Sequence, residues 1–456
     1  MTTATGSAVE HELALISGKD NIAEETRDIS GVLPVIAVSP RSAEEVAAIV
    51  NVANQRNLVI APAGGFTRQQ IGGAPERVDI LLRTDRLNRV RHYDSGDLTI
   101  GVDAGLSFGE MQRCLAEHRQ WIPFDPCNGS ASSVGGLLAT APSGPLKSGH
   151  GGLRDFCIGV EFVTGDGIVA KGGGRVVKNV AGYDLMKLLI GSYGSLAVIT
   201  GANFKVFPEF RQTRTFVCAF ASLTESLMFR TQVLNSPLST SIACMEIVSP
   251  KAPEYLREMP VAHDPDDYAP SEPLGAVPGE WEIALRFSGS EAVLARCSRE
   301  LGAAVSRELA GAEETKFWHW ISQFEESVLQ RHRNALVIYA NVAINDAGSA
   351  IEALERSAPD YNFLPAVVGR AATGNLIMGL VPLPVEPPNV MQYANCVSAF
   401  RGLLPPGSSA MVARCPKEAK GHFDLWGGTP TDVKLMRQIK QALDPKNVLN
   451  RGRFIV

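Results

Sequence analysis

The sequence predicts an α+β protein in which a glycine-rich, ligand-binding domain precedes a second domain built on an antiparallel sheet. Three observations support this prediction. Residues 30–210 alternate strand-like runs, helical patterns and glycine loops. In residues 211–410 glycine thins out, and strands and helices alternate with longer polar connections. Residues 411–456 close with an amphipathic helix, which begins near Pro430 and ends at Pro445. Mixed patterns of this kind are typical of layered α+β domains.

In the first region, strands are expected at 35–38, 58–61 and 99–102. Ser42 and Ser107 each precede a glutamate by three residues, which is the capping-box pattern that opens a helix. The preceding residues, 1–29, begin MTTATGSAVEHELA and lack a basic segment followed by an apolar one. We therefore expect residues 1–29 to be a short disordered lead and not a secretory signal.

In the second region, strands are expected at 214–220, 242–247, 281–287, 335–342 and 376–381, and helices at 222–234, 291–305 and 347–356. This order predicts an antiparallel sheet with helices on one face. Residues 250–280 are rich in proline and aspartate and are expected to form a surface excursion. The domain boundaries predicted in this way are 1–29, 30–210, 211–410 and 411–456.

Composition excludes several classes of protein. The 456 residues carry a net charge of −5, and no basic patch suggests a nucleic-acid partner. No apolar run reaches the ~18 residues of a transmembrane helix. The eight cysteines include no Cys-x-x-Cys pair, which argues against an iron–sulfur cluster or a structural zinc. The cytoplasm is the expected compartment.

Two glycine-bearing segments predict a site for a large, charged and flat cofactor. The first is Pro62–Thr67, with Gly72 shortly after it. The second is Ser132–Gly136, followed by Ala139 and Gly144. Glycines allow backbone N–H groups to approach a phosphate closely, and a diphosphate needs several such donors. One such segment alone could be a turn without a ligand, whereas both in this order are more specific. The chain has no G-x-G-x-x-G after a strand and no P-loop, so FAD is the favoured cofactor.

The motifs together resemble a known family. Pro62–Thr67, Asp125–Pro126, Val134–Gly136, Gly165–Gly167 and the run GSYGSLAVIT at 191–200 are similar to the FAD-binding domain of the vanillyl-alcohol oxidase, or PCMH-type, flavoproteins. The run GRVVKNVAGYDL at 174–185, with DLWG and LDP in the tail, resembles the E-type FAD-binding subunits of bacterial glycolate oxidases. The resemblance implies a two-part FAD domain, a cap domain, and a C-terminal segment that returns to the FAD domain.

The same resemblance implies roles for individual residues. Gly64, Gly65 and Thr67 would cradle the pyrophosphate, and Ser133, Gly135 and Gly136 would line the diphosphate and ribitol. Asp155, Gly159 and Gly165 would lead past the adenosine, and Val198 and Ile199 would lie beside the flavin ring. The full set implied for FAD is Pro62, Ala63, Gly64, Gly65, Phe66, Thr67, Gly72, Pro126, Ser133, Val134, Gly135, Gly136, Ala139, Gly144, Asp155, Gly159, Gly165, Val198 and Ile199.

Two departures from the family pattern affect the expected site. Phe66 stands where relatives usually have a third glycine, so either its side chain points away from the phosphates or the loop is reshaped. Covalent attachment in this fold often uses a histidine in the first glycine loop, but residues 61–73 contain none. Cys127 lies farther from Gly135 than the attachment cysteine of bicovalent relatives. Non-covalent FAD is therefore expected, with no metal in the chain.

The catalytic groups are less evident. Relatives that oxidise 2-hydroxy acids carry His-x-Gly-Asp-Gly-Asn-Leu-His in the cap, and the corresponding run here is Gly369–Ile377, in which both histidines are missing. The catalytic residues are thus unknown, and the weak candidates are Arg370, Tyr183, Lys178 and His150. Ordinary structural roles remain open for each of them, such as a surface ion pair for Arg370.

The resemblance implies an FAD-binding subunit of a heteromeric glycolate (2-hydroxy-acid) oxidase or dehydrogenase. Its expected partners are a catalytic flavoprotein with the intact histidine motif, an iron–sulfur subunit, and the small 2-hydroxy acid that the complex oxidises. Any contact with a membrane would be made through those partners. Two alternatives remain: a self-sufficient FAD oxidoreductase acting on a hydroxy acid or alditol, and a scaffold subunit without flavin.

Overall fold

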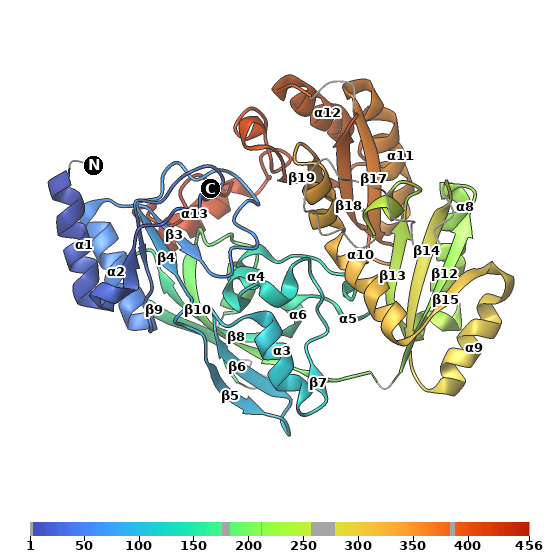
Figure 1. The fold of residues 1–456 in the computed structure, drawn as a ribbon, viewed down its shortest axis with the longest axis horizontal. Helices are drawn as coiled ribbons and strands as arrows, with labels where there is room; N and C mark the ends of the chain where they lie inside the picture. The colour runs from blue at the N-terminus through green and yellow to red at the C-terminus, as the bar shows by residue number, and fades with distance from the viewer. Residues whose placement is uncertain (1–2, 176–182, 211, 257–278, 384–387, 456) are drawn as a thin grey trace, which may run out of the picture.

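The computed structural model describes residues 3–175, 183–210, 212–256, 279–383 and 388–455, and these form two lobes (Figure 1). The first lobe comprises the described residues of 3–210 and 415–455. The second, which we call the cap, comprises those of 212–414. Within these residues, no helix combines the length and apolar character needed to cross a membrane.

The first lobe contains two main sheets. One has the order β1-β2-β4-β3, in which β2, β4 and β3 are parallel. The other is antiparallel, with the order β5-β6-β10-β8-β9, and a short β11-β7 pair lies apart from both. The strand bounds are β1 Ile22–Ala23, β2 Ile36–Val38, β3 Ile60–Ala63, β4 Ile80–Arg83, β5 Val90–Asp94, β6 Thr99–Asp103, β7 Gln120–Trp121, β8 Cys157–Thr164, β9 Val169–Gly173, β10 Ala197–Lys205 and β11 Phe207–Pro208. The helices are α1 Thr3–Ser17, α2 Ala43–Arg56, α3 Phe108–Ala116, α4 Val134–Thr140, α5 Lys147–His150, α6 Leu153–Phe156, α7 Leu185–Leu189 and α13 Val433–Leu443.

The predicted helix starts are confirmed. The side chains of Ser42, Ser107 and Ser222 accept hydrogen bonds from backbone N–H groups three residues later, at the first turns of α2, α3 and α8. The expected disordered lead is wrong, because Thr3–Ser17 form α1. Val9 and Leu13 of α1 are buried against α2, and this packing stabilises a helix that the sequence pattern alone did not predict.

The cap is built on one antiparallel sheet with the order β15-β12-β14-β13-β17-β18-β16-β19. Its strands are β12 Thr213–Phe220, β13 Ile242–Val248, β14 Trp281–Ser288, β15 Val305–Leu309, β16 Leu336–Asn341, β17 Phe363–Arg370, β18 Asn375–Pro382 and β19 Ser409–Arg414. Its helices are α8 Leu223–Leu234, α9 Glu291–Leu301, α10 Gly311–Arg331, α11 Ala347–Ser357 and α12 Val390–Leu403. Most of the predicted surface excursion at 250–280 lies outside the described residues.

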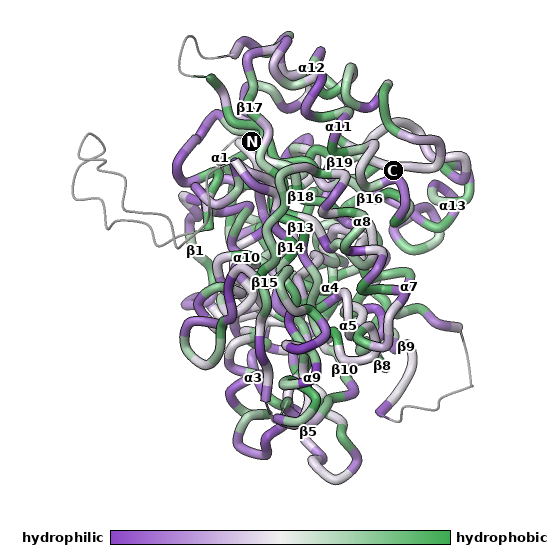
Figure 2. The backbone as a smooth tube through the Cα atoms, turned by 90° about the vertical axis from the view of Figure 1, so that its right-hand side faces the viewer, coloured by the Kyte–Doolittle hydropathy of each residue, from purple (hydrophilic) through white to green (hydrophobic). Residues whose placement is uncertain are grey.

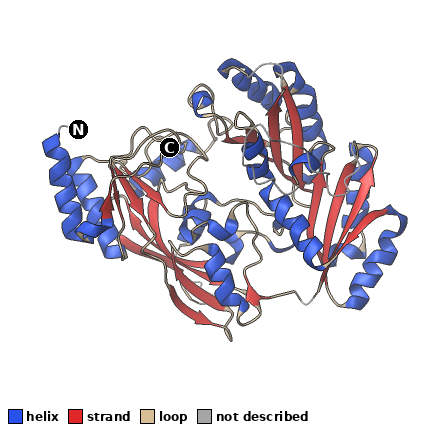
Figure 3. Cartoon of the chain, viewed as in Figure 1, coloured by secondary structure: helices blue, strands red, loops and turns tan. Residues whose placement is uncertain are grey.

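The helices of the cap cover both faces of its sheet and not one face, as the sequence led us to expect (Figures 1 and 3). Helices α8, α9, α11 and α12 pack on the outer face, around Met245 and Met378. Helix α10 packs on the inner face, where Phe324 meets Val217 and Val337. Because both faces are buried, the central strands β13, β14 and β18 are apolar along most of their length (Figure 2).

The C-terminal segment leaves the cap after Arg414, the last residue of β19, and returns to the first lobe (Figure 1). Lys440 of α13 donates from its buried Nζ to the carbonyl of Ser195 at 2.7 Å and to Asp444 at 2.6 Å. Farther along, Ile60 N–H donates to the Val448 carbonyl at 2.7 Å. The end of the chain is therefore bound to the same parallel sheet that carries the first glycine loop.

Candidate functional site

The two glycine segments of the sequence lie in contact. Pro62–Thr67 follow the parallel strand β3, and Ser132–Gly136 enter helix α4. The hydroxyls of Thr67 and Ser132 are 2.7 Å apart and hydrogen-bonded. Ser133 caps α4 by accepting from Gly136 N–H at 3.2 Å. Two segments about seventy residues apart in sequence therefore form the walls of one cleft.

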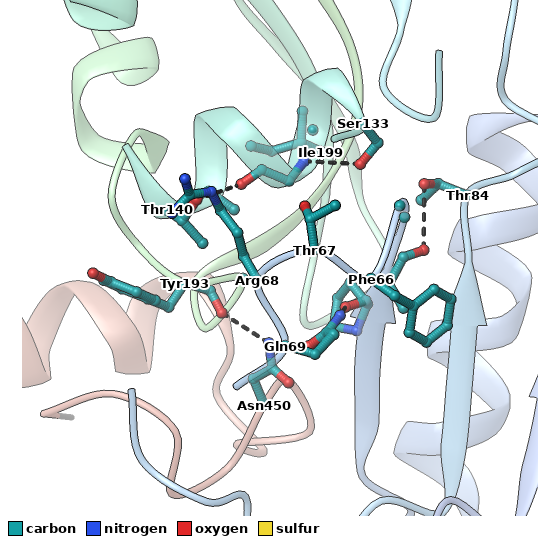
Figure 4. A pocket seen from close by; sticks show the side chains of 18 of the residues that line it. Phe66, Thr67, Arg68, Gln69, Thr84, Ser133, Thr140, Tyr193, Ile199 and Asn450 are labelled. Carbon is teal, nitrogen blue, oxygen red and sulfur yellow. Dashed lines mark hydrogen bonds between the residues drawn. The ribbon is translucent and has the colours of Figure 1, made fainter. Parts of the chain in front are cut away.

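This cleft encloses about 680 Å³ of space, counting its open mouth (Figure 4). Its lining from the predicted set consists of Pro62, Ala63, Gly64, Gly65, Phe66, Thr67, Ser133, Gly135, Gly136, Ala139 and Ile199. Nine further residues line it that the sequence analysis did not place there: Arg68, Gln69, Thr84, Thr140, Tyr193, Gly194, Ala197, Asn450 and Arg453. Asn450 and Arg453 belong to the C-terminal segment, and only the return of the chain to the first lobe brings them to the cleft.

The first loop supplies unused backbone donors. No acceptor among the described residues receives a hydrogen bond from the N–H groups of Gly64, Gly65, Phe66 or Thr67. The second loop differs, because Gly135 N–H donates to the Ala104 carbonyl at 2.7 Å. Consecutive free amides form a concave donor set that suits an anion. The free amides that could receive an anion are therefore mainly those of Gly64–Thr67.

The glycines of both loops are required by protein packing. A Cβ on Gly64 would lie 1.9 Å from the Ser133 hydroxyl oxygen, and one on Gly65 would lie 2.3 Å from the Ala131 carbonyl oxygen. A Cβ on Gly135 would lie 2.9 Å from that of Ala104. These glycines thus allow the two loops and the sheet to approach one another, and the cleft depends on that approach.

Phe66 occupies its position without blocking the cleft. Its φ of 59° lies in the left-handed region that favours glycine, so the backbone shape of a glycine is retained. Its ring turns away from Ser133 and Ile199 (Figure 4) and lies under the guanidinium of Arg27, 3.7 Å from the ring centroid. Of the two expectations for this residue, the first describes the structure: the side chain points away.

Arg453 holds the residues that directly follow the first glycine loop, Pro62–Thr67. One of its guanidinium nitrogens donates to the carbonyls of Arg68, Gln69 and Ile71, at 3.2, 2.8 and 3.1 Å. Burial lowers the pKa of Arg453 to about 10, so it remains a cation at neutral pH. Nearby, Tyr193, which also lines the cleft, stacks on Phe454 with ring centroids 5.4 Å apart.

The other residues of the predicted set lie outside the lining of this cleft. Gly72 packs on Trp426, Gly144 on Asp125, and Gly165 on Asp444. Gly159 lies in β8, Val134 and Val198 are core residues, Asp155 caps α6, and Pro126 lines a second cleft. Their positions support the fold around the first cleft.

The weak catalytic candidates are not brought together. Tyr183 is 90% exposed, and Lys178 lies outside the described residues. His150 packs between Trp121 and Phe210, and burial lowers its pKa. Arg370 differs from these, because it is buried where the cap meets the first lobe and donates to the Ser143 carbonyl at 3.0 Å. Within the described residues, no three His, Cys, Asp or Glu side chains are gathered as metal ligands.

Two protein-family models and several known proteins match this chain. Residues 34–173 match the FAD binding domain family, and residues 426–454 match the C-terminal domain of FAD linked oxidases. The chain is 25% identical to a D-lactate dehydrogenase of Archaeoglobus fulgidus, covering 92% of this chain and 91% of that one. It is also 25% identical to glycolate oxidase subunit GlcD of Bacillus subtilis (92% and 89%) and 26% identical to subunit GlcE of Escherichia coli (80% and 83%).

The fold agrees with that of a solved structure. The crystal structure of p-cresol methylhydroxylase with substrate bound superposes with a TM-score of 0.76, at 16% identity, over 99% of this chain and 97% of that one. This likeness identifies the PCMH-type architecture of a flavin-binding domain and a cap.

The cleft suits the cofactor that these matches imply. FAD carries a diphosphate, and the free amides of Gly64–Thr67 are the donors that a diphosphate requires. The loops between which it would lie keep their close approach only with glycine at 64 and 65. Residues 34–173 therefore carry an FAD binding domain and residues 426–454 a C-terminal domain of the FAD linked oxidases, within a chain of PCMH-type fold whose cofactor is FAD.

Proposed function

We propose that this chain is the FAD-binding subunit of a heteromeric glycolate (2-hydroxy-acid) oxidase or dehydrogenase. The main support is the cleft at Gly64–Thr67, which matches the cofactor, combined with similarity to GlcE over 80% of the chain. In this proposal the chain holds FAD and either passes electrons to, or supports, a catalytic flavoprotein and an iron–sulfur subunit.

The flavin is held without a covalent bond. No histidine occurs between residues 61 and 73. The thiol of Cys127 is buried, its Sγ lies 3.6 Å from Gln323 Oε1, and burial raises its pKa to about 12. A thiolate, which is the nucleophilic form, is therefore not available at neutral pH.

The residues of the cap support the proposal that this chain acts beside a catalytic partner. When bound, FAD accepts a hydride from a substrate carbon. Oxidation of an alcohol also needs a group that takes the hydroxyl proton. In the hairpin of β17 and β18, the residues at the two family histidine positions are Arg370 and Ile377. Neither an arginine nor an isoleucine serves as a general base at neutral pH.

Electrons must leave the reduced flavin. The eight cysteines are separate, and none forms a disulfide or a cluster of ligands in the described residues. An iron–sulfur subunit as the next carrier fits this pattern. One experiment tests the whole proposal: affinity purification of the tagged chain from its native host, with counting of flavins, irons and co-purifying polypeptides. Co-purification with a second flavoprotein and an iron–sulfur protein supports it, and a chain that purifies alone contradicts it.

A second function is favoured by one specific observation. The similarity to a D-lactate dehydrogenase spans 91% of that protein, and the seam between the lobes holds two buried carboxylates, Asp125 and Glu246. Either carboxylate could accept a proton, which would make the chain a self-sufficient hydroxy-acid oxidoreductase. Bleaching of the visible flavin absorbance when glycolate or D-lactate is added to the isolated chain would establish this function and exclude a purely supporting role. A protein isolated without colour would indicate the flavin-free scaffold.

A further inference from the structure

A row of charged side chains crosses the inner face of the cap sheet. Glu246 of β13 pairs in register with Arg370 of β17, and Cys244 of β13 pairs with Arg286 of β14. Directly paired residues of an antiparallel sheet point to the same face, and residues two apart on one strand share that face. Arg286 lies 3.2 Å from Glu314 of α10, which identifies the face as the inner one, toward the first lobe.

The centre of this row is buried and unsatisfied. Arg370 is 1% exposed and Glu246 is fully buried. The nearest approach between them, from Arg370 Nη1 to Glu246 Oε2, is 3.6 Å, which is too long for a hydrogen bond. No described residue provides a hydrogen-bond partner for Nε or Nη1 of Arg370 or for either carboxylate oxygen of Glu246. Leaving such groups without partners in the interior is costly, so a molecule that satisfies them is expected to bind.

The facing surface of the first lobe adds donors. The remaining terminal nitrogen of Arg370 is held by the Ser143 carbonyl at 3.0 Å, which orients the guanidinium. The buried hydroxyl of Ser143 also has no partner among the described residues. Two guanidinium nitrogens without a partner and one hydroxyl therefore lie in the same part of the seam. A planar carboxylate, with two acceptor oxygens, is the group that an arginine binds most specifically.

A second cleft reaches this region. It lies between α10 and the first lobe and encloses about 1170 Å³, counting its open mouth. Trp121, Phe124 and Trp318 line it, and so do Asp125 and Arg286. The Asp125 carboxylate accepts from Leu146 N–H at 3.0 Å, and both Arg370 and Arg286 act on it electrostatically. Arg370, Ser143 and Glu246 do not line this cleft, and Asp125 is the lining residue that connects it to Arg370.

We propose that Arg370, with Ser143 beside it, binds the carboxylate of a small organic acid that enters through this second cleft. The choice of a 2-hydroxy acid rests on the proposed function, whereas the carboxylate chemistry follows from the unpartnered donors. The site does not require that this chain oxidises the acid, since binding needs only Arg370 and the facing loop. It explains why an arginine is buried here opposite the first lobe.

Glu246 makes the binding depend on pH. Burial raises the pKa of Glu246 to about 7, and Arg370 only partly offsets this effect. The other charged or titratable groups near the pair are Asp125, Cys244, Arg286 and Lys147. A neutral Glu246 leaves Arg370 free for an external anion, whereas an ionised Glu246 occupies Arg370 and repels that anion. Affinity for the acid should therefore fall as the pH rises through about 7.

The test uses the full chain loaded with FAD. Isothermal titration with glycolate, D-lactate and acetate is performed at about pH 6 and about pH 8.5. We expect binding at the lower pH and at least about tenfold weaker binding at the higher pH. Arg370→Met should weaken binding about 10- to 100-fold, the range of a charge-assisted pair. Glu246→Gln should keep the affinity at the higher pH. Arg214→Met, on the outer edge of the cap, is the matched control and should bind like the wild type.

Arg370→Met could misfold because it leaves Glu246 without its cation. The double variant Arg370→Met with Glu246→Gln removes both charges, and it should fold and still lose acid binding. If the wild type gives no binding heat at either pH, or if the double variant binds like the wild type, the site does not exist and the pair is only structural. Visible flavin absorbance is recorded for the same samples. A colourless chain that still binds the acid would refute the proposed function without refuting this site.

Discussion

Arg453, three residues before the end of the chain, donates a hydrogen bond to the carbonyl of Gln69 at 2.8 Å. The two residues are separated by 384 positions, and the bond joins the C-terminal segment to the loop that carries the free amides of the FAD cleft. The same nitrogen also reaches the carbonyls of Arg68 and Ile71. The shape of this loop therefore depends on the C-terminal segment.

Replacing Arg453 should release the cofactor. Arg453→Met removes the hydrogen bonds to the carbonyls of Arg68, Gln69 and Ile71, of which only that of Ile71 then has no other donor among the described residues, at a cost of about 1–3 kcal/mol. We expect FAD occupancy, measured by visible absorbance per protein, to fall at least about tenfold. The exposed Arg437→Met on α13 is the control and should retain the wild-type occupancy. Full occupancy in Arg453→Met would show that the loop keeps its shape without the C-terminal segment.

Adding one methyl group to the first loop should have a similar effect. In Gly65→Ala the new Cβ would lie 2.3 Å from the backbone oxygen of Ala131, so one of the two loops must move. We expect FAD binding to be lost and the melting temperature to fall by several degrees. Gly152→Ala is the control, because its Cβ would meet no atom within 4 Å. The idea of loops held in contact fails if both variants bind FAD equally.

Stability should decrease as the pH rises toward neutrality. The pKa values of Asp125 and Glu246 are both raised by burial to about 7, above those of the unfolded chain. The folded protein therefore binds more protons than the unfolded one between about pH 4 and pH 7. Stability from these groups is fully present below that window and is lost as the pH rises through about 7, by an amount on the order of 1–3 kcal/mol per group.

Urea unfolding of the wild type and of Glu246→Gln at several pH values measures this effect. Glutamine does not titrate, so the stability of the variant should depend less on pH across that window. The assignment of a neutral Glu246 is wrong if the two proteins show the same pH dependence. It is also wrong if the wild type becomes more stable as the pH rises from about 5 to about 7.

The flavin should leave the protein on denaturation. Residues 61–73 contain no histidine and the Cys127 thiol is protonated, so neither of the attachment positions considered offers a side chain suited to a bond with the flavin ring. Acid precipitation should release all yellow colour into the supernatant, and the spectrum of the released compound should be that of FAD. A fluorescent protein band on a denaturing gel would contradict this expectation.

Local patterns predicted much of the fold. The serine caps at positions 42, 107 and 222 open helices as expected, because a cap is formed by residues three positions apart. The glycine loop at 62–67 was found for the same reason. Helix α1 was missed, because its stability comes from burying Val9 and Leu13 against α2. The placement of α10 on the inner face of the cap was also missed, since both faces of a buried sheet are apolar.

The sequence by itself favoured FAD, because two glycine segments occur in this order without a G-x-G-x-x-G or P-loop motif. It also indicated that the cap lacks the histidines of hydroxy-acid oxidases. Only the tertiary structure decided which backbone amides are free. The N–H of Gly135 donates a hydrogen bond to the Ala104 carbonyl, whereas the N–H of Gly65 has no acceptor among the described residues. Only the tertiary structure placed Arg370 beside Glu246 and opposite Ser143. The two contacts of Arg370 join residues more than a hundred positions apart, and spacing along a chain carries no information about contacts that folding alone creates.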